Sequence, residues 1–514
     1  MIIRQNGQQK NLADPEKIGL LLRHEASSTA SRATNTLDMG AIRIPKLNLT
    51  GIDQTVKEAI LEEIRAYGPM PFSRFMELSL YCNNGHYAKK TSFSDIGFRT
   101  TAEDSGLFGA TIGNGFARLW KAMGKPERFD IFEMGAGSGK LARDLMLYAQ
   151  LYNSDFYKAI NYVIVELTEA RIMEQRACLQ SFADKISWIR ASAYDLPVKG
   201  INGAFVSNEL VDAFPIEIVT RKNGSIRQRY ISADEDGVLV VGWGNPSPEV
   251  IRHIKENGIG VEEGKNEPIN LMAEKLQKRL DMALEKGAIL TIDYGDKTNS
   301  LNGFSSGKPI RAYPSDKLFR YLSGEIEMLE QKRLTKGRYE GIMIGDIKLL
   351  RDLESIIGKS NSEYETRMAN LRKSAGKYNK GDATEEDLAQ YKLLRRLYKY
   401  ISRSVGTWPA YVLPGEFDIT ADVNFSVLEK IAISDGLRYE FFGHQDKLLK
   451  KFGYNEVYIN VAGDIGIKGA LYFKIGSIDK SVGRHERFMK KIQPVSDYED
   501  YNALLLTKGV YGWP

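Results

Sequence analysis

The residues best arranged for chemistry in this chain follow short apolar runs. The clearest segment is Phe132–Lys140, where Glu133 precedes the glycines Gly135, Gly137 and Gly139. Glycines in this arrangement allow a sharp turn and let a bulky ligand approach the backbone closely. A dinucleotide-binding turn, G-x-G-x-x-G, seats a pyrophosphate at a helix N-terminus. Here the third glycine comes one residue earlier, and a carboxylate precedes the first glycine.

The charge of Glu133 decides which ligand suits this turn. A carboxylate repels a pyrophosphate but attracts a ligand that carries an amino group and a sulfonium. The turn therefore favours S-adenosylmethionine over NAD as the cofactor, with Glu133, Gly135, Ala136 and Gly137 in the binding site. The alternative is a glycine-rich turn that has a purely structural role.

Two more acidic residues follow later apolar runs. Glu166 ends the next run, and an acid at the end of the second strand of a nucleotide-binding sheet accepts hydrogen bonds from ribose hydroxyls. Asp195 lies in the loop after the third run, where it could bind the adenine amino group while Tyr194 or Trp188 packs on the ring. The alternatives are a surface carboxylate at Glu166 and a loop aspartate without a ligand.

The candidate catalytic residues Asn208, Glu209 and Asp212 follow the fourth run. Because ligands bind at the C-terminal ends of parallel strands, we expect this polar group to face the transferred methyl group. Methyl transfer requires an aligned lone pair and, where necessary, a proton acceptor. Glu209 and Asp212 could together hold a cationic acceptor such as a guanidinium. The structural alternatives are a helix cap at Asp212 and a turn at Asn208.

Composition excludes several classes of protein. The 514 residues are too many for one compact core, so two or three lobes are expected. Hydrophobic residues make up 43% and charged residues 27%, which is typical of a globular protein and not of a disordered or fibrous one. The formal net charge of +5 is small and gives no argument for a nucleic-acid partner.

Individual residue types narrow the expectation further. Cys82 and Cys178 are the only cysteines, which excludes a disulfide framework and a cysteine metal cluster. The five histidines are scattered, so no metal site is expected. No run of about 18 apolar residues occurs, so no membrane span is expected. Residues 1–40 carry neither the apolar core of a secretory signal nor the acid-poor composition of a transit peptide, and the expected location is the cytoplasm.

The order of the expected elements predicts an α/β fold. The expected strands are Phe129–Met134, Tyr162–Glu166, Ile186–Arg190, Gly203–Ser207 and Ala288–Asp293. Helical patterns separate the first strands, which indicates a Rossmann-like, mostly parallel sheet covered on both faces. Two runs that flank Lys222-Asn223-Gly224 predict a hairpin within a β insertion.

Changes of pattern along the chain give the expected organisation. The expected parts are an N-terminal extension (1–52), an N-terminal helical segment (53–125), a core (126–313) with a β insertion at about 216–245, a charged helical insertion (314–414) and a C-terminal part of the core (415–514). In the last part, strands are expected at Glu456–Val461 and Gly469–Ile475.

Several motifs in this order resemble the MidA-like family of class I S-adenosylmethionine-dependent methyltransferases. The similar segments are Gly68–Glu77, Gly85–Tyr87, Phe98–Gly109, the glycine turn, Ser207–Pro215, Ile292–Gly295, Arg311–Tyr313, Asp418–Ala421 and Gln445. The resemblance implies a class I methyltransferase sheet with one antiparallel strand. It also implies a donor site that includes the loop from Thr100 to Ser105, and an acceptor region near Asn208, Glu209 and Asp212.

The chain also departs from the family pattern. Ala102, Asp422 and His444 replace its usual proline, histidine and threonine, and a long insertion separates Arg311–Tyr313 from Asp418–Ala421. An insertion at that joint could reshape the acceptor pocket.

Three functions are compatible with these observations. The first expectation is methyl transfer to nitrogen or oxygen of a small-molecule or peptide acceptor, because the departures cluster on the acceptor side. The second is a protein arginine N-methyltransferase, since the family includes an arginine methyltransferase that serves as a mitochondrial complex I assembly factor. The third is a non-catalytic, donor-binding assembly factor. A homodimer is a further possibility.

Overall fold

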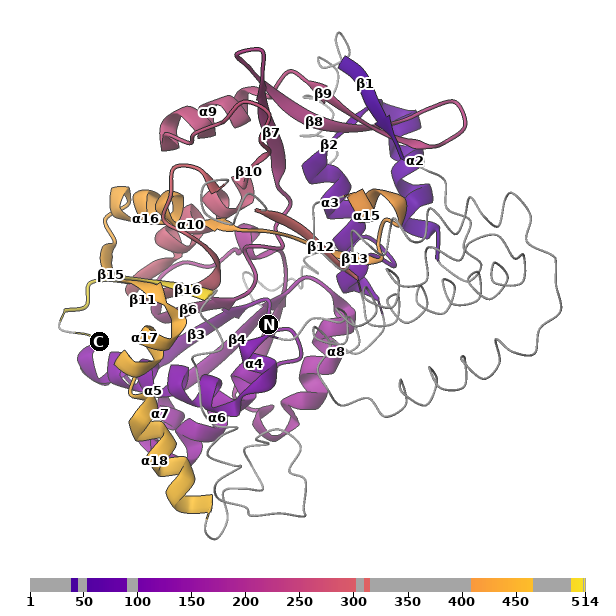
Figure 1. Cartoon of the computed structure of the whole chain (residues 1–514). Coiled ribbons are helices and arrows are strands. Elements are labelled where there is room, and N and C mark those ends of the chain that lie inside the picture. The colour runs from indigo at the N-terminus through magenta and orange to yellow at the C-terminus, as the bar shows by residue number, and fades with distance from the viewer. Residues whose placement is uncertain are drawn as a thin grey trace, which may run out of the picture.

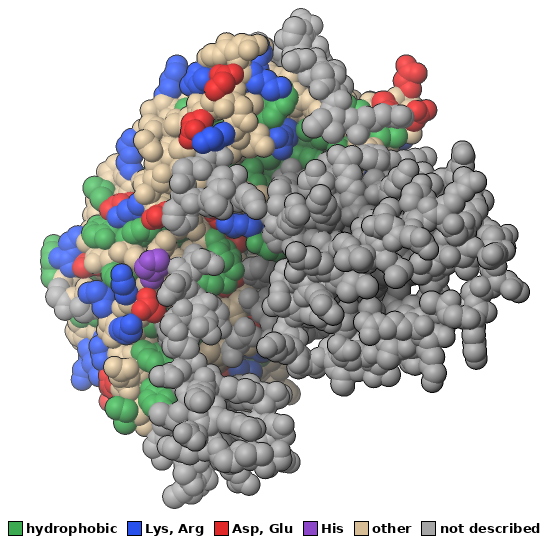
Figure 2. Space-filling model, in the orientation of Figure 1, with side chains coloured by type: hydrophobic (Ala, Val, Ile, Leu, Met, Phe, Trp, Pro, Cys, Tyr) green, Lys and Arg blue, Asp and Glu red, His purple; other side chains and the backbone are tan. Residues whose placement is uncertain are grey.

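The computed structural model describes residues 38–44, 53–89, 100–301, 309–314, 408–465, 501–511 and 513. Most of the predicted helical insertion (314–414) and the predicted strand Gly469–Ile475 lie outside these residues. Over the coloured part of the face in Figure 2, basic and acidic side chains are interspersed.

A central sheet lies near the middle of the molecule in Figure 1, with helices below it. Its main strands are, in spatial order, β15 (Arg438–His444), β16 (Tyr501–Lys508), β11 (Leu284–Asp296), β6 (Ile201–Asn208), β3 (Phe129–Met134), β4 (Ile160–Glu166) and β5 (Ile186–Arg190). β16 runs antiparallel to both of its neighbours, and the pairs from β11 to β5 are parallel. The predicted mostly parallel sheet with one antiparallel strand is confirmed.

Alternating side chains of each central strand supply the cores on the two faces of this sheet. Ile131 of β3 belongs to one buried cluster and the next residue, Phe132, to the opposite one. This alternation follows from the two-residue repeat of a strand. The helices of the first face are α5 (Gly106–Ala122), α6 (Lys140–Tyr152), α7 (Ser154–Ala159), α8 (Glu169–Cys178) and α17 (Gln445–Lys451). Those of the other face are α10 (Leu271–Ala283) and α16 (Phe425–Ser434).

A second sheet lies at the top of the molecule in Figure 1. Its strands are, in spatial order, β1 (Asp38–Arg43), β9 (Leu239–Gly244), β8 (Ser225–Ala233), β7 (Glu217–Lys222) and β10 (Glu267–Ile269), and β2 (Met70–Pro71) pairs with β8. The predicted hairpin is β7–β8, and its turn residues Asn223 and Gly224 have φ values of 51° and 76°. This sheet therefore extends beyond the predicted insertion to include β1 and β10. α9 (Pro248–Asn257) packs against it.

N-terminal helices and a small sheet join the two larger sheets. The elements are α2 (Thr55–Tyr67), α3 (Phe72–Tyr81), α15 (Trp408–Val412), β12 (Ile310–Pro314) and β13 (Phe417–Ala421). Phe72 and Phe75 of α3 pack with Tyr411, Phe417 and Ile419 in one buried cluster. β13 leads into β14 (Val423–Asn424), which pairs with the C-terminal end of β11. Segments distant in sequence therefore meet beside the C-terminal ends of the central strands.

One predicted strand is wrong. Residues 456–461 belong to the helix α18 (Tyr454–Ile465), which packs against α5. Val457 and Val461 are both buried, as expected for residues one helical turn apart on the same face. The remaining short elements are η1 (His86–Ala88), α4 (Thr101–Asp104), η3 (Gln180–Phe182) and η4 (Ala193–Asp195). In the part of the chain that the structure describes, no helix is long and apolar enough to cross a membrane.

Candidate active site

The glycine turn connects β3 to α6 at the C-terminal edge of the central sheet. Gly135 and Gly139 have φ values of 69° and 87°, which favour glycine, and Gly139 is the residue before α6. A Cβ atom on Gly135 would lie 2.7 Å from Leu210 Cδ1. The turn therefore needs glycine at position 135 for its backbone conformation and for the packing of the loop after β6.

The carboxylate of Glu133 is buried at the end of β3. The Tyr162 hydroxyl donates a hydrogen bond to Glu133 Oε2 over 2.8 Å. Burial, with a smaller contribution from the Glu166 charge, raises the pKa of Glu133 to about 7 although the Tyr162 hydrogen bond lowers it. A cationic ligand would favour the ionised form of this side chain.

Glu166 lies at the end of β4, and Gln175 of α8 links its carboxylate to the glycine turn. Its Oε1 accepts hydrogen bonds from the N–H groups of Leu167 and Thr168 at 2.8 and 3.0 Å. Gln175 Nε2 donates both to Glu166 Oε2 over 3.1 Å and to Gly137 O over 3.0 Å. Burial raises the pKa of Glu166, and these hydrogen bonds oppose the increase. No local sequence pattern indicates a role for Gln175, because that role depends on the packing of α8.

The short helix α4 is fixed to the glycine turn by Glu103. The Glu103 carboxylate accepts a hydrogen bond from the Ser138 hydroxyl and pairs with Lys140 Nζ at 2.5 Å. Thr100 caps α4 by accepting a hydrogen bond from the Glu103 N–H over 3.2 Å, and Ser105 stands between α4 and α5. The segment from Thr100 to Ser105 thus lies beside the turn.

Asp195 lies elsewhere on this edge. It is exposed and pairs with Lys275 of α10 at 2.7 Å. The Lys275 ammonium also lies 5.1 Å from the ring centroid of Tyr194, which packs edge-on against Phe214. The described contacts of Asp195 are therefore with α10 and not with the glycine turn.

The last residue of β6, Asn208, and the loop that follows it present the candidate catalytic side chains, which include Glu209 and Asp212. Glu209 has a φ of 51°, which is uncommon for a residue with a side chain, and its N–H donates to Ile292 O over 2.9 Å. Asn208 Nδ2 donates to Glu209 Oε1 over 3.1 Å. Burial and the charge of Asp293 raise the pKa of Glu209 well above its usual range. This backbone conformation aims two polar side chains from adjacent positions at one site.

Asp293 of β11 fixes the conformation of that loop. Its Oδ2 accepts hydrogen bonds from the N–H groups of Val211 and Asp212 at 2.9 and 3.3 Å, and its Oδ1 from the Tyr294 N–H at 2.8 Å. Burial raises the pKa of Asp293 to about 7 against the effect of these hydrogen bonds. The motif Ile292–Gly295 was recognised in the sequence, but the contact of Asp293 with the loop was not.

Asp212 and Asp418 bring two further buried carboxylates to the site. Burial and then the charges of Asp293, Asp418 and Glu209 raise the pKa of Asp212 well above its usual range, while Arg311 lowers it. The pKa of Asp418 is raised to about 6 by burial, although the Tyr87 hydroxyl donates a hydrogen bond to its Oδ1 over 2.7 Å.

Arg311 and the tyrosines Tyr294 and Tyr501 border the same site. Arg311 pairs with Asp422 at 2.8 Å. The hydroxyl groups of Tyr294 and Tyr501 contact each other, and a hydrogen bond from Tyr501 lowers the pKa of Glu209.

Several buried oxygen atoms around this site have no hydrogen-bond partner among the described residues. They include three acceptor atoms, Asn208 Oδ1, Asp418 Oδ2 and Gln445 Oε1. Gln445 belongs to the network because its Nε2 donates to Thr101 Oγ1 over 3.3 Å, and the Thr101 N–H lowers the pKa of Glu209. All three atoms are acceptors, and buried acceptors are normally satisfied. A ligand rich in N–H groups would satisfy them.

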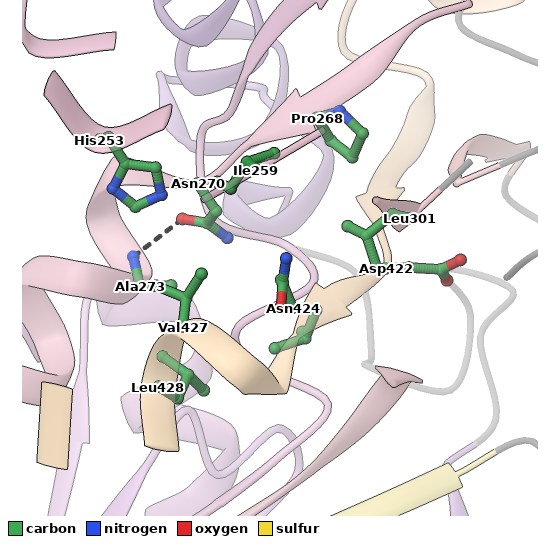
Figure 3. A pocket seen from close by; sticks show the side chains of 11 residues that line it. His253, Ile259, Pro268, Asn270, Ala273, Leu301, Asp422, Asn424, Val427 and Leu428 are labelled. Carbon is green, nitrogen blue, oxygen red and sulfur yellow. Dashed lines mark hydrogen bonds between the residues drawn. The ribbon is translucent and has the colours of Figure 1, made fainter. Parts of the chain in front are cut away.

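A small pocket on the other side of Asp422 is a separate feature. Figure 3 shows the Asp422 carboxylate pointing away from the side chains of His253 and Asn270. The pocket volume of about 20 Å³ accommodates a water molecule but is too small for a methyl donor. Asn270 Nδ2 donates to Val211 O over 3.0 Å, so this pocket backs the loop after β6.

The residues of the glycine turn fit S-adenosylmethionine. The turn exposes backbone without a Cβ at Gly135 and Gly137, and the two acids Glu133 and Glu166 lie at the ends of neighbouring strands. No group of three or more His, Cys, Asp and Glu side chains in the described parts of the chain is arranged to hold a metal ion.

Known proteins share this sequence pattern and this fold. A family model for S-adenosyl-L-methionine-dependent methyltransferases matches residues 111–323. The chain is 24% identical over 284 residues to a mitochondrial protein arginine methyltransferase NDUFAF7 homolog of Drosophila melanogaster, covering 48% of this chain and 62% of the relative. It is 25% identical over 280 residues to the mitochondrial protein arginine methyltransferase NDUFAF7 of Homo sapiens, with the same coverage. The chain thus matches 62% of the length of these relatives.

Two solved structures have the same fold. One is a COG1565 superfamily protein from Burkholderia thailandensis, with a TM-score of 0.58 and 20% identity, covering 91% of this chain and 96% of that chain. The other is a COG1565 superfamily member from the same organism bound to S-adenosyl-homocysteine, with a TM-score of 0.59 and the same identity and coverage. The glycine turn and the sheet order described above are those of a class I methyltransferase fold, and the sequence resembles the MidA-like family of S-adenosylmethionine-dependent methyltransferases.

Proposed function

We propose that this protein transfers a methyl group from S-adenosylmethionine to a guanidinium nitrogen of an arginine in a protein. The observation that carries the proposal is the group of carboxylates beside the glycine turn, Glu209, Asp212 and Asp418, with buried acceptor atoms that lack partners. A guanidinium carries five N–H donors and a fixed positive charge, and it binds carboxylates through charge-assisted hydrogen bonds. The names of the curated relatives, protein arginine methyltransferases, support the same choice.

In this proposal the donor occupies the crevice at Glu133, Gly135, Ala136, Gly137 and Glu166. Bound S-adenosylmethionine supplies a methyl carbon attached to a positively charged sulfur. Glu133 attracts the cationic end of the donor, and Glu166 accepts hydrogen bonds from ribose hydroxyls once Gln175 has fixed its position.

Thr100 and Ser105, at the two ends of α4, border the donor. Asp195 is exposed and would contact the adenine only after its ion pair with Lys275 breaks.

The acceptor side uses Asn208, Glu209 and Asp212. In the free protein the pKa values of Glu209 and Asp212 are raised, so these two carboxyl groups hold protons until a cation binds. The guanidinium favours their ionised forms and is held by them with one nitrogen directed at the donor. As the nitrogen–carbon bond forms and the carbon–sulfur bond breaks, the nitrogen loses its proton to a carboxylate, and the proton then passes to water.

The competing acceptor, a small molecule or peptide, was favoured by the long insertion, most of which lies outside the described residues. The described carboxylates favour a strongly basic, planar group instead. A cytoplasmic location remains an expectation from the sequence, and the relatives cited above are mitochondrial proteins.

The proposal is tested by Glu209→Gln. The rate of S-adenosylhomocysteine formation with arginine-containing protein acceptors should fall by at least 100-fold, because the variant loses both a charge and a proton acceptor. Its affinity for S-adenosylhomocysteine, measured by calorimetry, should stay within twofold of the parent. Glu235→Gln, at an exposed position in the turn between β8 and β9, is the matched control. Undiminished turnover in Glu209→Gln would contradict the assignment.

A further inference from the structure

Two tyrosines from the N-terminal part of the chain reach into the region of the acceptor carboxylates. Tyr81 is the last residue of α3, and its hydroxyl donates to Ala213 O over 2.8 Å. Tyr87 belongs to η1, and its hydroxyl donates to Asp418 Oδ1 over 2.7 Å. The Tyr81 hydroxyl is therefore anchored on the loop after β6, and the Tyr87 hydroxyl on β13.

These anchors orient the two rings as a stacked pair. Their centroids are 5.7 Å apart and their planes differ by 21°. His86 packs edge-on against Tyr87 with a centroid distance of 5.1 Å, so the outer side of Tyr87 is occupied. Tyr87 stacks on one face of the Tyr81 ring, and the Tyr81 side chain stays partly buried while it also packs beside the cluster of Phe72 and Phe75. An aromatic face held rigidly in this way is a binding surface for a planar cation.

Carboxylates of both halves of the site act on the Tyr81 hydroxyl. Burial raises the pKa of the Tyr81 hydroxyl well above its usual range. Tyr194 and the charges on Asp418, Asp212 and Glu166 raise this pKa further. Glu166 belongs to the donor crevice, and Asp212 and Asp418 belong to the acceptor side. Tyr81 therefore lies where the two subsites adjoin.

Asp418 provides an unused acceptor at the same place. Its side chain is 1% exposed, its Oδ1 is engaged by Tyr87, and its Oδ2 has no hydrogen-bond partner in the described parts of the chain. Leaving a buried carboxylate oxygen unsatisfied is unfavourable. An N–H donor from a ligand is the natural partner for Oδ2.

We propose that Tyr81, Tyr87 and Asp418 form the subsite that selects a guanidinium over an ammonium acceptor. Asp418 Oδ2 accepts a hydrogen bond from a guanidinium N–H, and the face of Tyr81 opposite Tyr87 packs on the guanidinium plane. Tyr87 acts as a positioning residue that holds Asp418. A lysine ammonium is compact and strongly hydrated and offers no plane for stacking, so it gains less from this subsite. The inference rests on the proposed function and adds the residues that define its substrate class.

The experiment measures binding, which separates it from the test of methyl transfer. N-acetyl-arginine amide and N-acetyl-lysine amide are titrated into the full-length protein saturated with S-adenosylhomocysteine. The parent protein should bind the arginine compound at least tenfold more tightly. Asp418→Asn should weaken that binding on the order of 100-fold, since it removes one partner of a buried charged pair. Tyr81→Leu should weaken it about tenfold through loss of the ring face.

Controls distinguish recognition from folding. Tyr81→Phe keeps the ring and should bind the arginine compound within threefold of the parent protein. Tyr67→Leu, at an exposed tyrosine of α2, should bind it like the parent. All variants should retain affinity for S-adenosylhomocysteine within twofold.

Equal binding of the two compounds by the parent protein would overturn the inference even if methyl transfer to arginine occurs. Parent-like arginine binding by both Asp418→Asn and Tyr81→Leu would also overturn it, as would an equal loss of donor affinity in these variants. Failure of methyl transfer with the binding preference intact would instead refute the proposed function.

Discussion

Asp293 Oδ2 accepts a hydrogen bond from the Val211 N–H over 2.9 Å and thereby joins the end of β11 to the loop after β6. The same oxygen accepts from the Asp212 N–H. Two segments that are 82 residues apart in the chain thus share one carboxylate at the point where the donor crevice meets the acceptor side. The position of Asp212 depends on this carboxylate.

Replacing Asp293 by Asn tests that dependence. The amide has one acceptor oxygen in place of two, so either the Tyr294 N–H or the loop N–H groups of Val211 and Asp212 lose their partner. We expect the free energy of unfolding to fall by about 1–3 kcal/mol and turnover to fall by at least tenfold, with donor affinity retained. Denaturant unfolding and initial rates measure the two effects. Asp435→Asn, at an exposed position after α16, should change neither. Turnover that equals the parent rate would show that the loop does not need Asp293.

The pKa of Glu133 predicts a pH-dependent donor affinity. With a pKa of about 7 in the free protein, this carboxyl group is largely protonated at pH 6 and largely ionised at pH 8. Because the ionised form attracts the cationic donor, the affinity for S-adenosylmethionine should rise on the order of tenfold between these values. Glu133→Gln should bind the donor more weakly at pH 8 and lose this dependence. Calorimetric titrations at several pH values measure both, and a parent affinity that is flat over this range would contradict the role given to Glu133.

Substitutions at two glycines with positive φ distinguish the effect of backbone strain from the effect of a side chain placed in the donor crevice. Gly135→Ala introduces a Cβ atom 2.7 Å from Leu210, whereas Gly124, with a φ of 90°, has no atom within 4 Å of such a Cβ. Both substitutions should destabilise the fold by about 1–2 kcal/mol through backbone strain. Only Gly135→Ala should also abolish donor binding, because the added methyl group and the displaced Leu210 side chain fill the crevice. The comparison uses thermal unfolding and calorimetry, and donor binding by Gly135→Ala at parent affinity would refute this placement of the crevice.

The raised pKa of Glu217, which lies outside the candidate active site, predicts how the free energy of unfolding changes with pH. Burial raises its pKa to about 7, against the effect of hydrogen bonds from Ser73 and Gln228, whereas the unfolded chain has a value near 4.5. The folded state therefore keeps a proton that the unfolded state releases, and the contribution of Glu217 to stability falls as the pH rises from about 4.5 to 7.

Glu217→Gln removes this titration. Relative to the parent protein, the variant should become more stable by a few kcal/mol on going from pH 5 to pH 8. Urea unfolding at both pH values measures the difference. If the variant and the parent protein differ in free energy of unfolding by the same amount at pH 5 and pH 8, the raised pKa of Glu217 is contradicted.

Local patterns allowed much of the sheet to be predicted. The strand Phe129–Met134 has the bounds expected from its apolar run, and the glycines after it turn as expected. Both features follow from short stretches of sequence, where residue type limits the backbone directly. The error at 456–461 has the opposite origin. Glu456–Val461 is rich in strand-favouring residues, but packing of Val457 and Val461 against α5 stabilises a helix.

Pairings between distant segments could not be predicted from one sequence. Tyr87 and Asp418 are 331 residues apart, and Gln445 and Thr101 are 344 residues apart, yet each pair forms a hydrogen bond at the site. Their motifs were recognisable, but no local pattern states which of them meet. The candidate residues at 208–212 were found because they directly follow a strand of the parallel sheet, where position alone indicates a site.

Locating a transferred methyl group tests whether the acceptor is an arginine. Protein extracts are incubated with the full-length protein and S-adenosylmethionine that carries an isotopically labelled methyl group, and labelled peptides are identified by tandem mass spectrometry. We expect label on arginine side chains with the parent protein and none above background with Glu209→Gln. Label found only on other residue types or on small molecules, or no label at all, would contradict this expectation.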